Sequence, residues 1–263
     1  MNEHRLLKAA LAIVLLIGPA GARPVSARPL AAIAADGTLR VGMTGDYAPF
    51  AVREADGRLF GADVTMAESL AKALGVALVI VPTTWKTLAA DLAADRYDVA
   101  MGGVSITPDR SALGDFSHPV LHDGKRPIAR CAEKDRFTSL PAIDRNDVRV
   151  VVNPGGTNER FAKANLGHAT IIEHSDNRRI FDEIAAGRAD VMVTDGAEVD
   201  YQARRHPGVL CPAPVPDSFD HFDKAYWMTR DPALKAAVDT WLDQALAAGE
   251  YARALEAADT REP

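Results

Sequence analysis

The chain has 263 residues, of which 48% are hydrophobic and 25% are charged, and its formal net charge at pH 7 is −6. This length and apolar content suffice for one large globular unit or for two smaller lobes, each with its own core. The acidic balance argues against a nucleic-acid partner and leaves no polybasic patch for a membrane surface.

The first 27 residues have the pattern of a secretory signal peptide. Arg5 and Lys8 precede an apolar run over residues 9–17, and small residues follow as far as Val25-Ser26-Ala27. The apolar run is too short to span a bilayer. We therefore expect residues 1–27 to be removed on export and the mature chain to work in the periplasm without a membrane partner. A retained membrane anchor is the alternative.

Strands and helices are predicted to alternate over residues 37–101. The predicted strands cover residues 37–43, 77–81 and 97–101, and the predicted helices cover residues 63–74 and 85–94, with a hairpin around Asp56-Gly57. This order indicates an α/β lobe with a mostly parallel sheet. The segment 116–130 contains Pro119 and Pro127 and is expected to be extended, carrying the chain out of that lobe.

A second α/β series follows. Its predicted strands cover residues 148–152, 170–172 and 191–193, and its predicted helices cover residues 157–165 and 177–186. The segment 211–216 holds three prolines and is predicted to be a linker. A strand over residues 225–229 and amphipathic helices over residues 232–258 end the chain. We expect a first lobe of residues 36–127 and 224–263, a second lobe of residues 128–223, and a cleft between them.

The two cysteines, Cys131 and Cys211, both lie beyond the predicted signal peptide. In an oxidising compartment an even pair predicts a disulfide. Two unrelated buried thiols are the alternative.

Two carboxylates follow the predicted strand over residues 191–193. Asp195 and Glu198 are three residues apart, with Gly196 between them. If a helix begins at Asp195, both side chains lie on one face of its first turn and point toward the cleft, where open α/β sheets bind their ligands. The alternative is an Asp that caps the helix and a Glu that is solvated.

The turn that contains Ser105, Thr107 and Arg110 is a candidate carboxylate site. A guanidinium group can hold a carboxylate through two hydrogen bonds, and the two hydroxyls would add further donors. A solvated arginine at a helix start is the alternative.

The run Asn153-Pro154-Gly155-Gly156-Thr157 joins a predicted strand to a helix, so free backbone N–H groups should face the cleft. The run lacks the residues of a nucleotide-binding loop, and a carboxylate is the better guest. Glycines that serve the turn alone are the alternative.

Three further residues are candidates for the cleft. Asp46 and Trp85 follow predicted strand ends of the first lobe, and an aromatic wall would suit a ring substrate. Lys125 lies in the extended segment near the expected hinge, where it could pair with a second anionic group. A core tryptophan and a surface lysine are the alternatives. No metal site is expected, because Pro119 makes a helical His118/His122 pair improbable.

Residues 36–258 resemble the type II periplasmic solute-binding proteins of the polar amino-acid family. The resemblance rests on Tyr47-x-Pro49-Phe50, Gly61-Ala62-Asp63-Val64, Gly103-Val104-Ser105-Ile106-Thr107-Pro108-Asp109-Arg110 and Phe116-Ser117-His118-Pro119. It implies a two-lobed α/β fold with a central cleft, in which Arg110 holds the carboxylate of the ligand and Asp195 matches the residue that binds its amino group.

Other motifs are closer to an enzyme branch of that family, the periplasmic cyclohexadienyl dehydratases. These motifs are Asp123-Gly124-Lys125, Asn153-Pro154-Gly155-Gly156-Thr157-Asn158-Glu159 and Thr194-Asp195-Gly196-Ala197-Glu198. The resemblance implies a carbon–oxygen lyase that needs no cofactor and converts prephenate to phenylpyruvate and arogenate to phenylalanine. Glu198 is then the proton donor, and Trp85 belongs to the site. A non-catalytic amino-acid receptor that feeds a membrane transporter is the alternative.

Overall fold

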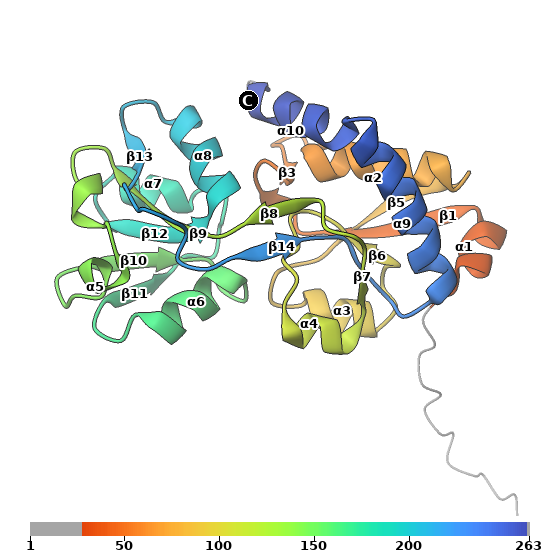
Figure 1. The fold of residues 1–263 in the computed structure, drawn as a ribbon, viewed down its shortest axis with the longest axis horizontal. Coiled ribbons are helices and arrows are strands. Elements are labelled where there is room, and N and C mark those ends of the chain that lie inside the picture. The colour runs from red at the N-terminus through yellow and green to blue at the C-terminus, as the bar shows by residue number, and fades with distance from the viewer. Residues whose placement is uncertain (1–27, 262–263) are drawn as a thin grey trace, which may run out of the picture.

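The computed structural model describes residues 28–261, which form two lobes joined by a narrow waist (Figure 1). The predicted signal peptide, residues 1–27, lies outside the described residues. Each lobe is built on a five-stranded sheet with helices on its faces. The predicted two-lobed α/β fold is thereby confirmed. No helix in the described range is long and apolar enough to cross a bilayer.

Lobe 1 contains the first sheet, whose strand order is β5-β1-β6-β15-β7. Its strands are β1 (Thr38–Met43), β5 (Ala77–Pro82), β6 (Val99–Ala100), β7 (Asp115–Phe116) and β15 (Trp227–Met228). Its helices are α1 (Leu30–Asp36), α2 (Ala62–Ala73), α3 (Leu88–Ala93), α4 (Pro108–Leu113), α9 (Pro232–Ala247) and α10 (Glu250–Thr260). A small antiparallel sheet of β2 (Asp46–Tyr47), β3 (Ala51–Arg53) and β4 (Leu59–Phe60) includes the predicted hairpin.

Lobe 2 contains the second sheet, whose strand order is β11-β10-β12-β9-β13. Its strands are β9 (Lys125–Arg130), β10 (Arg149–Val152), β11 (Thr170–Glu173), β12 (Val191–Asp195) and β13 (Leu210–Pro212). Its helices are α5 (Leu140–Ile143), α6 (Thr157–Asn165), α7 (Ile180–Ala185) and α8 (Gly196–Arg205), with a 3-10 turn η1 (Lys134–Arg136).

The chain crosses between the lobes twice, through β8 (Leu121–Asp123) and β14 (Phe222–Lys224). These strands pair with each other in antiparallel fashion and form the two-stranded ribbon at the waist (Figure 1). The predicted boundary after residue 127 falls inside β9, whose strand belongs to the second sheet, and the boundary after residue 223 falls inside β14. The exact division into lobes stays a prediction.

Both sheets are mixed and less parallel than the sequence pattern predicts. In each sheet the first three strands are parallel, and the last two pair in antiparallel fashion. The antiparallel strands β9 and β15 come directly after the two crossings, so they enter each sheet from the waist. The predicted linker over residues 211–216 is wrong in its first two residues, because Cys211 and Pro212 belong to β13. Proline is tolerated there because β13 is an edge strand.

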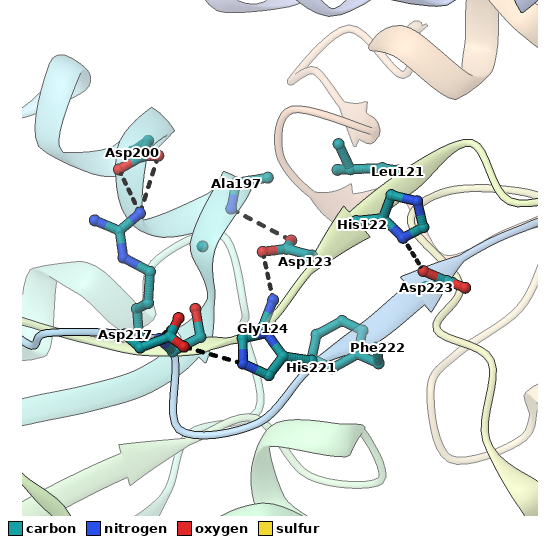
Figure 2. A pocket seen from close by; sticks show the side chains of 13 residues that line it. Leu121, His122, Asp123, Gly124, Ala197, Asp200, Asp217, His221, Phe222 and Asp223 are labelled. Atoms are coloured by element: carbon teal, nitrogen blue, oxygen red, sulfur yellow. Dashed lines mark hydrogen bonds and ion pairs between the residues drawn. The ribbon is translucent and has the colours of Figure 1, made fainter.

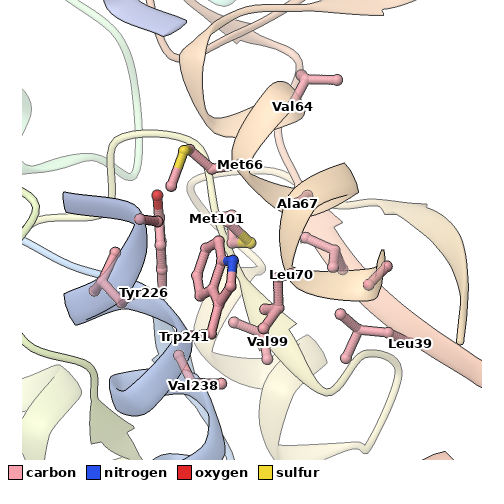
Figure 3. Packing of buried hydrophobic residues seen from close by; sticks show 14 of the residues in the cluster. Leu39, Val64, Met66, Ala67, Leu70, Val99, Met101, Tyr226, Val238 and Trp241 are labelled. Atoms are coloured by element: carbon pink, nitrogen blue, oxygen red, sulfur yellow. The ribbon is translucent and has the colours of Figure 1, made fainter. Parts of the chain in front are cut away.

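The core of lobe 1 lies between α2, α9 and the sheet (Figure 3). Met66 and Leu70 project from α2 at helical spacing and pack with Val238 and Trp241 of α9 and with Val99 of β6. Burying each such side chain stabilises the fold by roughly 1.5–3 kcal/mol. Two smaller clusters cover the two faces of the lobe 2 sheet.

An arginine–aspartate pair recurs at the same place in both lobes. Arg40 of β1 donates from its backbone N to Asp98 Oδ2 (2.8 Å) and from its guanidinium group to Asp98 Oδ1 (2.7 Å). Arg149 of β10 makes the same two contacts with Asp190, at 2.8 and 2.7 Å. Each pair ties one strand, β1 or β10, to the residue directly before its parallel neighbour, β6 or β12.

Candidate functional site

The central feature of the cleft is Asp195, which ends β12 and precedes α8. Its carboxylate is buried and accepts hydrogen bonds from three parts of the chain. Lys125 Nζ donates to Oδ1, while Tyr47 Oη and Lys224 Nζ donate to Oδ2, the last at 2.6 Å. Burial alone would raise the pKa of Asp195, but the two ammonium groups outweigh it and hold that pKa well below its usual range. Asp195 is therefore ionised and bridges two lysines.

Lys125 is buried and has two further partners, so the surface alternative for this residue is wrong. Its Nζ donates to Thr157 Oγ1 (2.9 Å) and to Asn158 Oδ1 at the start of α6. The lysine thus joins the two helix starts that face the cleft from lobe 2.

Glu198 lies on the first turn of α8, and only 1% of its surface is exposed. Thr194 Oγ1 donates to Glu198 Oε2 (2.5 Å), and Asn158 Nδ2 donates to Thr194 Oγ1 (2.9 Å). Burial raises the pKa of Glu198 to about 8; the Thr194 hydrogen bond opposes this rise, and the charge of Asp195 adds to it. Two carboxyl groups on one helical turn are therefore in opposite protonation states at neutral pH.

Lobe 1 contributes Arg110, from α4, to the opposite wall. The guanidinium group is buried, and its Nη1 donates to the backbone oxygen of Ser105 (2.8 Å). Burial lowers the pKa of Arg110 to about 10, with a further contribution from the charge of Arg160, so the side chain is a cation at neutral pH. The alternative of a solvated arginine is wrong. The face of Trp85 lies 6.0 Å from the guanidinium carbon.

These groups enclose a small space between the lobes, here called the inner cavity, of about 10 Å³. Its lining residues come from both lobes: Tyr47, Trp85, Gly103, Ser105, Arg110, Asn153, Gly156, Thr157, Asn158 and Asp195. Seven of these are residues that the sequence predicts for the site. Such a volume holds about one water molecule, so the lobes must separate before a ring-sized ligand can enter.

Several contacts hold the lobes in this closed arrangement. Tyr47 of lobe 1 reaches Asp195 of lobe 2, and Asn177 Nδ2 donates to the backbone oxygen of Asp46 (3.0 Å). Within lobe 1, Trp85 packs edge-on against Tyr47, with ring centroids 5.4 Å apart. An exposed pair between Arg160 and Asp109 (3.4 Å) spans the cleft nearby.

The remaining predicted residues lie just outside the inner cavity. Asp46 accepts a hydrogen bond from Trp85 Nε1 (3.0 Å), and burial raises its pKa. Asp46 and Glu198 both line a second inter-lobe cavity of about 240 Å³. Thr107 and Lys125 line a third, of about 340 Å³, at another opening of the cleft. In the closed structure Glu198 thus lines the second cavity and not the inner cavity.

A larger cavity than these, about 730 Å³, lies at the waist (Figure 2). Asp123, at its centre, accepts hydrogen bonds from the backbone N of Gly124 (2.8 Å) and of Ala197 (3.3 Å). The charged side chains around it form pairs: Arg126 with Asp200, His122 with Asp223, and His221 with Asp217. None of the predicted site residues lines this cavity.

Cys131 and Cys211 form the predicted disulfide, which joins the residue directly after β9 to β13 within lobe 2. Over residues 28–261 no group of three or more His, Cys, Asp or Glu side chains is placed to hold a metal ion.

Sequence reasoning missed Lys224, Asn158 and Thr194. Lys224 stands alone in Phe222-Asp223-Lys224 on a short strand, and no pattern marks it as buried. Asn158 and Thr194 lie inside motifs quoted for the resemblance, so a closer reading of those motifs could have found them. Lys224 is one of the donors to Asp195, and Asn158 and Thr194 form the hydrogen-bonded chain that reaches Glu198.

The profile of the bacterial extracellular solute-binding proteins, family 3, matches residues 39–257. The chain belongs to this family. It is also 46% identical over 255 residues to a cyclohexadienyl dehydratase from Pseudomonas aeruginosa, covering 97% of this chain and 94% of that protein.

Solved structures agree with this placement. An ancestral amino-acid-binding protein, described as a precursor of cyclohexadienyl dehydratase, is 35% identical with a TM-score of 0.78, covering 86% of this chain and 97% of the other. An ancestral cyclohexadienyl dehydratase is 47% identical with a TM-score of 0.56, covering 90% and 98%. An arginine-bound transporter substrate-binding protein from Streptococcus pneumoniae is 25% identical with a TM-score of 0.80, covering 87% and 97%.

Proposed function

We propose that the chain is a cyclohexadienyl dehydratase, which converts prephenate to phenylpyruvate and arogenate to phenylalanine. The observation that carries the proposal is the buried Glu198, whose pKa of about 8 keeps it protonated at neutral pH. A receptor that only binds its ligand has no use for a proton donor at this position. The 46% identity to a dehydratase over nearly the whole chain supports the same conclusion.

The reaction breaks two bonds of the substrate ring. The ring carboxylate leaves as carbon dioxide, and its bonding electron pair enters the ring. The ring hydroxyl on the opposite carbon takes the proton of Glu198 and leaves as water, which completes the aromatic ring. Glu198 is left as a carboxylate and regains a proton from solvent when the cleft opens. Atoms and charge balance without a cofactor.

The other cleft residues bind and orient the substrate. Arg110 and the N–H groups around Gly156 and Thr157 suit the two carboxylates, because charged donors in a water-poor site bind anions strongly. Trp85 forms one wall against the ring. The inner cavity holds only about one water, so we infer that substrate binds to an opened form and that closure excludes water and keeps Glu198 protonated.

A turnover assay tests the proposal. The mature protein should release phenylpyruvate from prephenate, measured by the absorbance of the product in alkali. Glu198→Gln should lower kcat by about 10²–10⁴-fold, because a positioned general acid contributes that much. Glu68→Gln, an exposed change on α2, is the matched control and should keep the full rate. No turnover above the spontaneous rate, with an amino acid raising the melting temperature instead, would support the receptor alternative.

We also propose that the enzyme works in the periplasm after residues 1–27 are removed. The basic and apolar pattern of that segment supports this, as does membership of an extracellular protein family. The intact mass of the exported chain should correspond to a protein that begins at Arg28. A mass that includes the first 27 residues would contradict the proposal.

A further inference from the structure

Lys224 is a buried cation that the predicted site did not contain. It comes from the waist strand β14, and none of its surface is exposed. Its Nζ donates to Asp195 Oδ2 (2.6 Å) and to the backbone oxygen of Gly103 (3.1 Å). The rings of Phe50, Tyr47 and Phe222 lie 5.0–5.3 Å from the same nitrogen. Oxygens and aromatic faces thus hold the ammonium group in place.

Asp195 is the one carboxylate among the residues that line the inner cavity. A substrate ammonium group inside this cavity would have to find its charge partner there. Both carboxylate oxygens are already used, Oδ1 by Lys125 and Oδ2 by Lys224 and Tyr47. A carboxylate offers about four acceptor positions, so little capacity remains.

The charge balance has the same consequence. Two lysines on one aspartate leave the cluster with a net positive charge, and Arg110 adds another on the opposite wall. An incoming ammonium group would meet cations on both sides. A keto oxygen, in contrast, can accept a hydrogen bond from such donors.

We propose that Lys224 is a specificity-determining residue, which together with Lys125 occupies the acceptor positions of Asp195 and makes the site select 2-oxo acids over 2-amino acids. This inference rests on the proposed dehydratase function and deepens it. For that reaction it means that prephenate, which carries the keto group, is the better substrate and arogenate, which carries the ammonium group, is the poorer one.

The test compares kcat/KM for prephenate and for arogenate. The unmodified enzyme should favour prephenate, and Lys224→Met should lower the prephenate-to-arogenate ratio by about tenfold or more, because it removes a positive charge that repels the ammonium group. Lys224→Arg keeps the charge and should keep the ratio within about threefold. A purely structural role would lower both values together and leave the ratio unchanged.

Lys72→Met is the matched control, because it removes an exposed lysine charge of α2 that does not line the inner cavity. Its ratio should equal that of the unmodified enzyme. An unmodified enzyme that prefers arogenate, or a Lys224→Met enzyme with an unchanged ratio, would overturn the proposal.

A binding measurement keeps the proposal testable if Lys224→Met does not fold or if no turnover is found. Calorimetry at pH 7 on the unmodified protein should show that phenylpyruvate binds at least about tenfold more tightly than phenylalanine. Equal or tighter binding of phenylalanine would overturn the proposal. Absence of turnover together with selective phenylpyruvate binding would count against the dehydratase function alone.

Discussion

The two lobes share a scaffold but differ in what they place at the cleft. In both lobes an arginine–aspartate pair ties a strand, β1 or β10, to the residue directly before its parallel neighbour, β6 or β12. The pairs are Arg40–Asp98 in lobe 1 and Arg149–Asp190 in lobe 2. Beyond these pairs, β6 of lobe 1 is followed by Gly102-Gly103, whereas β12 of lobe 2 ends in Thr194-Asp195. The sheets are alike, so the chemical difference lies in the residues that follow the strand ends.

The two lobes also have different roles in the proposed reaction. Lobe 1 supplies Arg110 and the aromatic wall, which suit binding of an anionic ring. Lobe 2 supplies the neutral Glu198, which suits proton transfer, beside the N–H groups around Gly156 and Thr157. Changes in lobe 1 should therefore alter KM first, and a change of Glu198 in lobe 2 should alter kcat.

The largest expected effect on stability comes from the disulfide, which only lobe 2 contains among the described residues. Replacing Cys131 and Cys211 together by Ala should lower the free energy of unfolding by about 4 kcal/mol, because the bond closes a long loop of the unfolded chain. All three tryptophans, Trp85, Trp227 and Trp241, are in lobe 1. In urea, circular dichroism should therefore show an early transition of lobe 2 in the variant, ahead of tryptophan fluorescence. Coincident and unshifted transitions would show that the disulfide does not stabilise lobe 2 selectively.

A smaller effect is expected at Arg110 in lobe 1. Arg110→Met should raise KM for prephenate by about 10- to 100-fold, because a hydrogen bond to a charged group contributes about 1.5–3 kcal/mol. Steady-state kinetics measure this, and kcat should change much less. Arg58→Met is the control, since Arg58 is exposed on the hairpin of lobe 1, pairs with Asp56 and lines none of the cleft cavities described above. A loss confined to kcat would contradict the division of tasks between the lobes.

The smallest effect is the pH dependence set by Glu198. The pKa of this residue is raised from its ordinary value to about 8, and the proposed reaction needs its protonated form. In a plot of kcat/KM against pH, the part that Glu198 controls should therefore be flat below pH 8. Well above pH 8, kcat/KM should fall about tenfold per pH unit. A pH profile of prephenate turnover measures this alkaline fall. The residual activity of Glu198→Gln should not show it. If kcat/KM already decreases with rising pH at values under pH 6, Glu198 is not a neutral acid in the free enzyme.

Much of the fold was predictable because hydrophobic periodicity marks long elements. The predicted helix over residues 63–74 corresponds to α2, and the predicted strand over residues 148–152 corresponds to β10. The edge strand β13 was missed, because its short proline-containing segment looks like a linker and its pairing with β9 is not local. The antiparallel strands that enter from the waist were not predictable as such, since periodicity does not give strand direction.

The site was predictable where residues follow strand ends in recognisable motifs, as with Arg110, Asn153 and Asp195. Lys224 was not predictable, because its burial depends on a strand that pairs with a segment about one hundred residues away. The opposite protonation of Asp195 and Glu198 also depends on tertiary structure. Two lysines reach the first carboxylate, whereas a threonine hydroxyl reaches the second.

The paired strands β8 and β14 have a consequence for how the molecule can move. Two independent linkers would let one lobe rotate, slide and twist freely against the other. A hydrogen-bonded ribbon has fewer such freedoms, because its strands must bend together to keep their pairing. We therefore expect opening to follow essentially one axis, so that the two walls return to the same alignment each time the cleft closes.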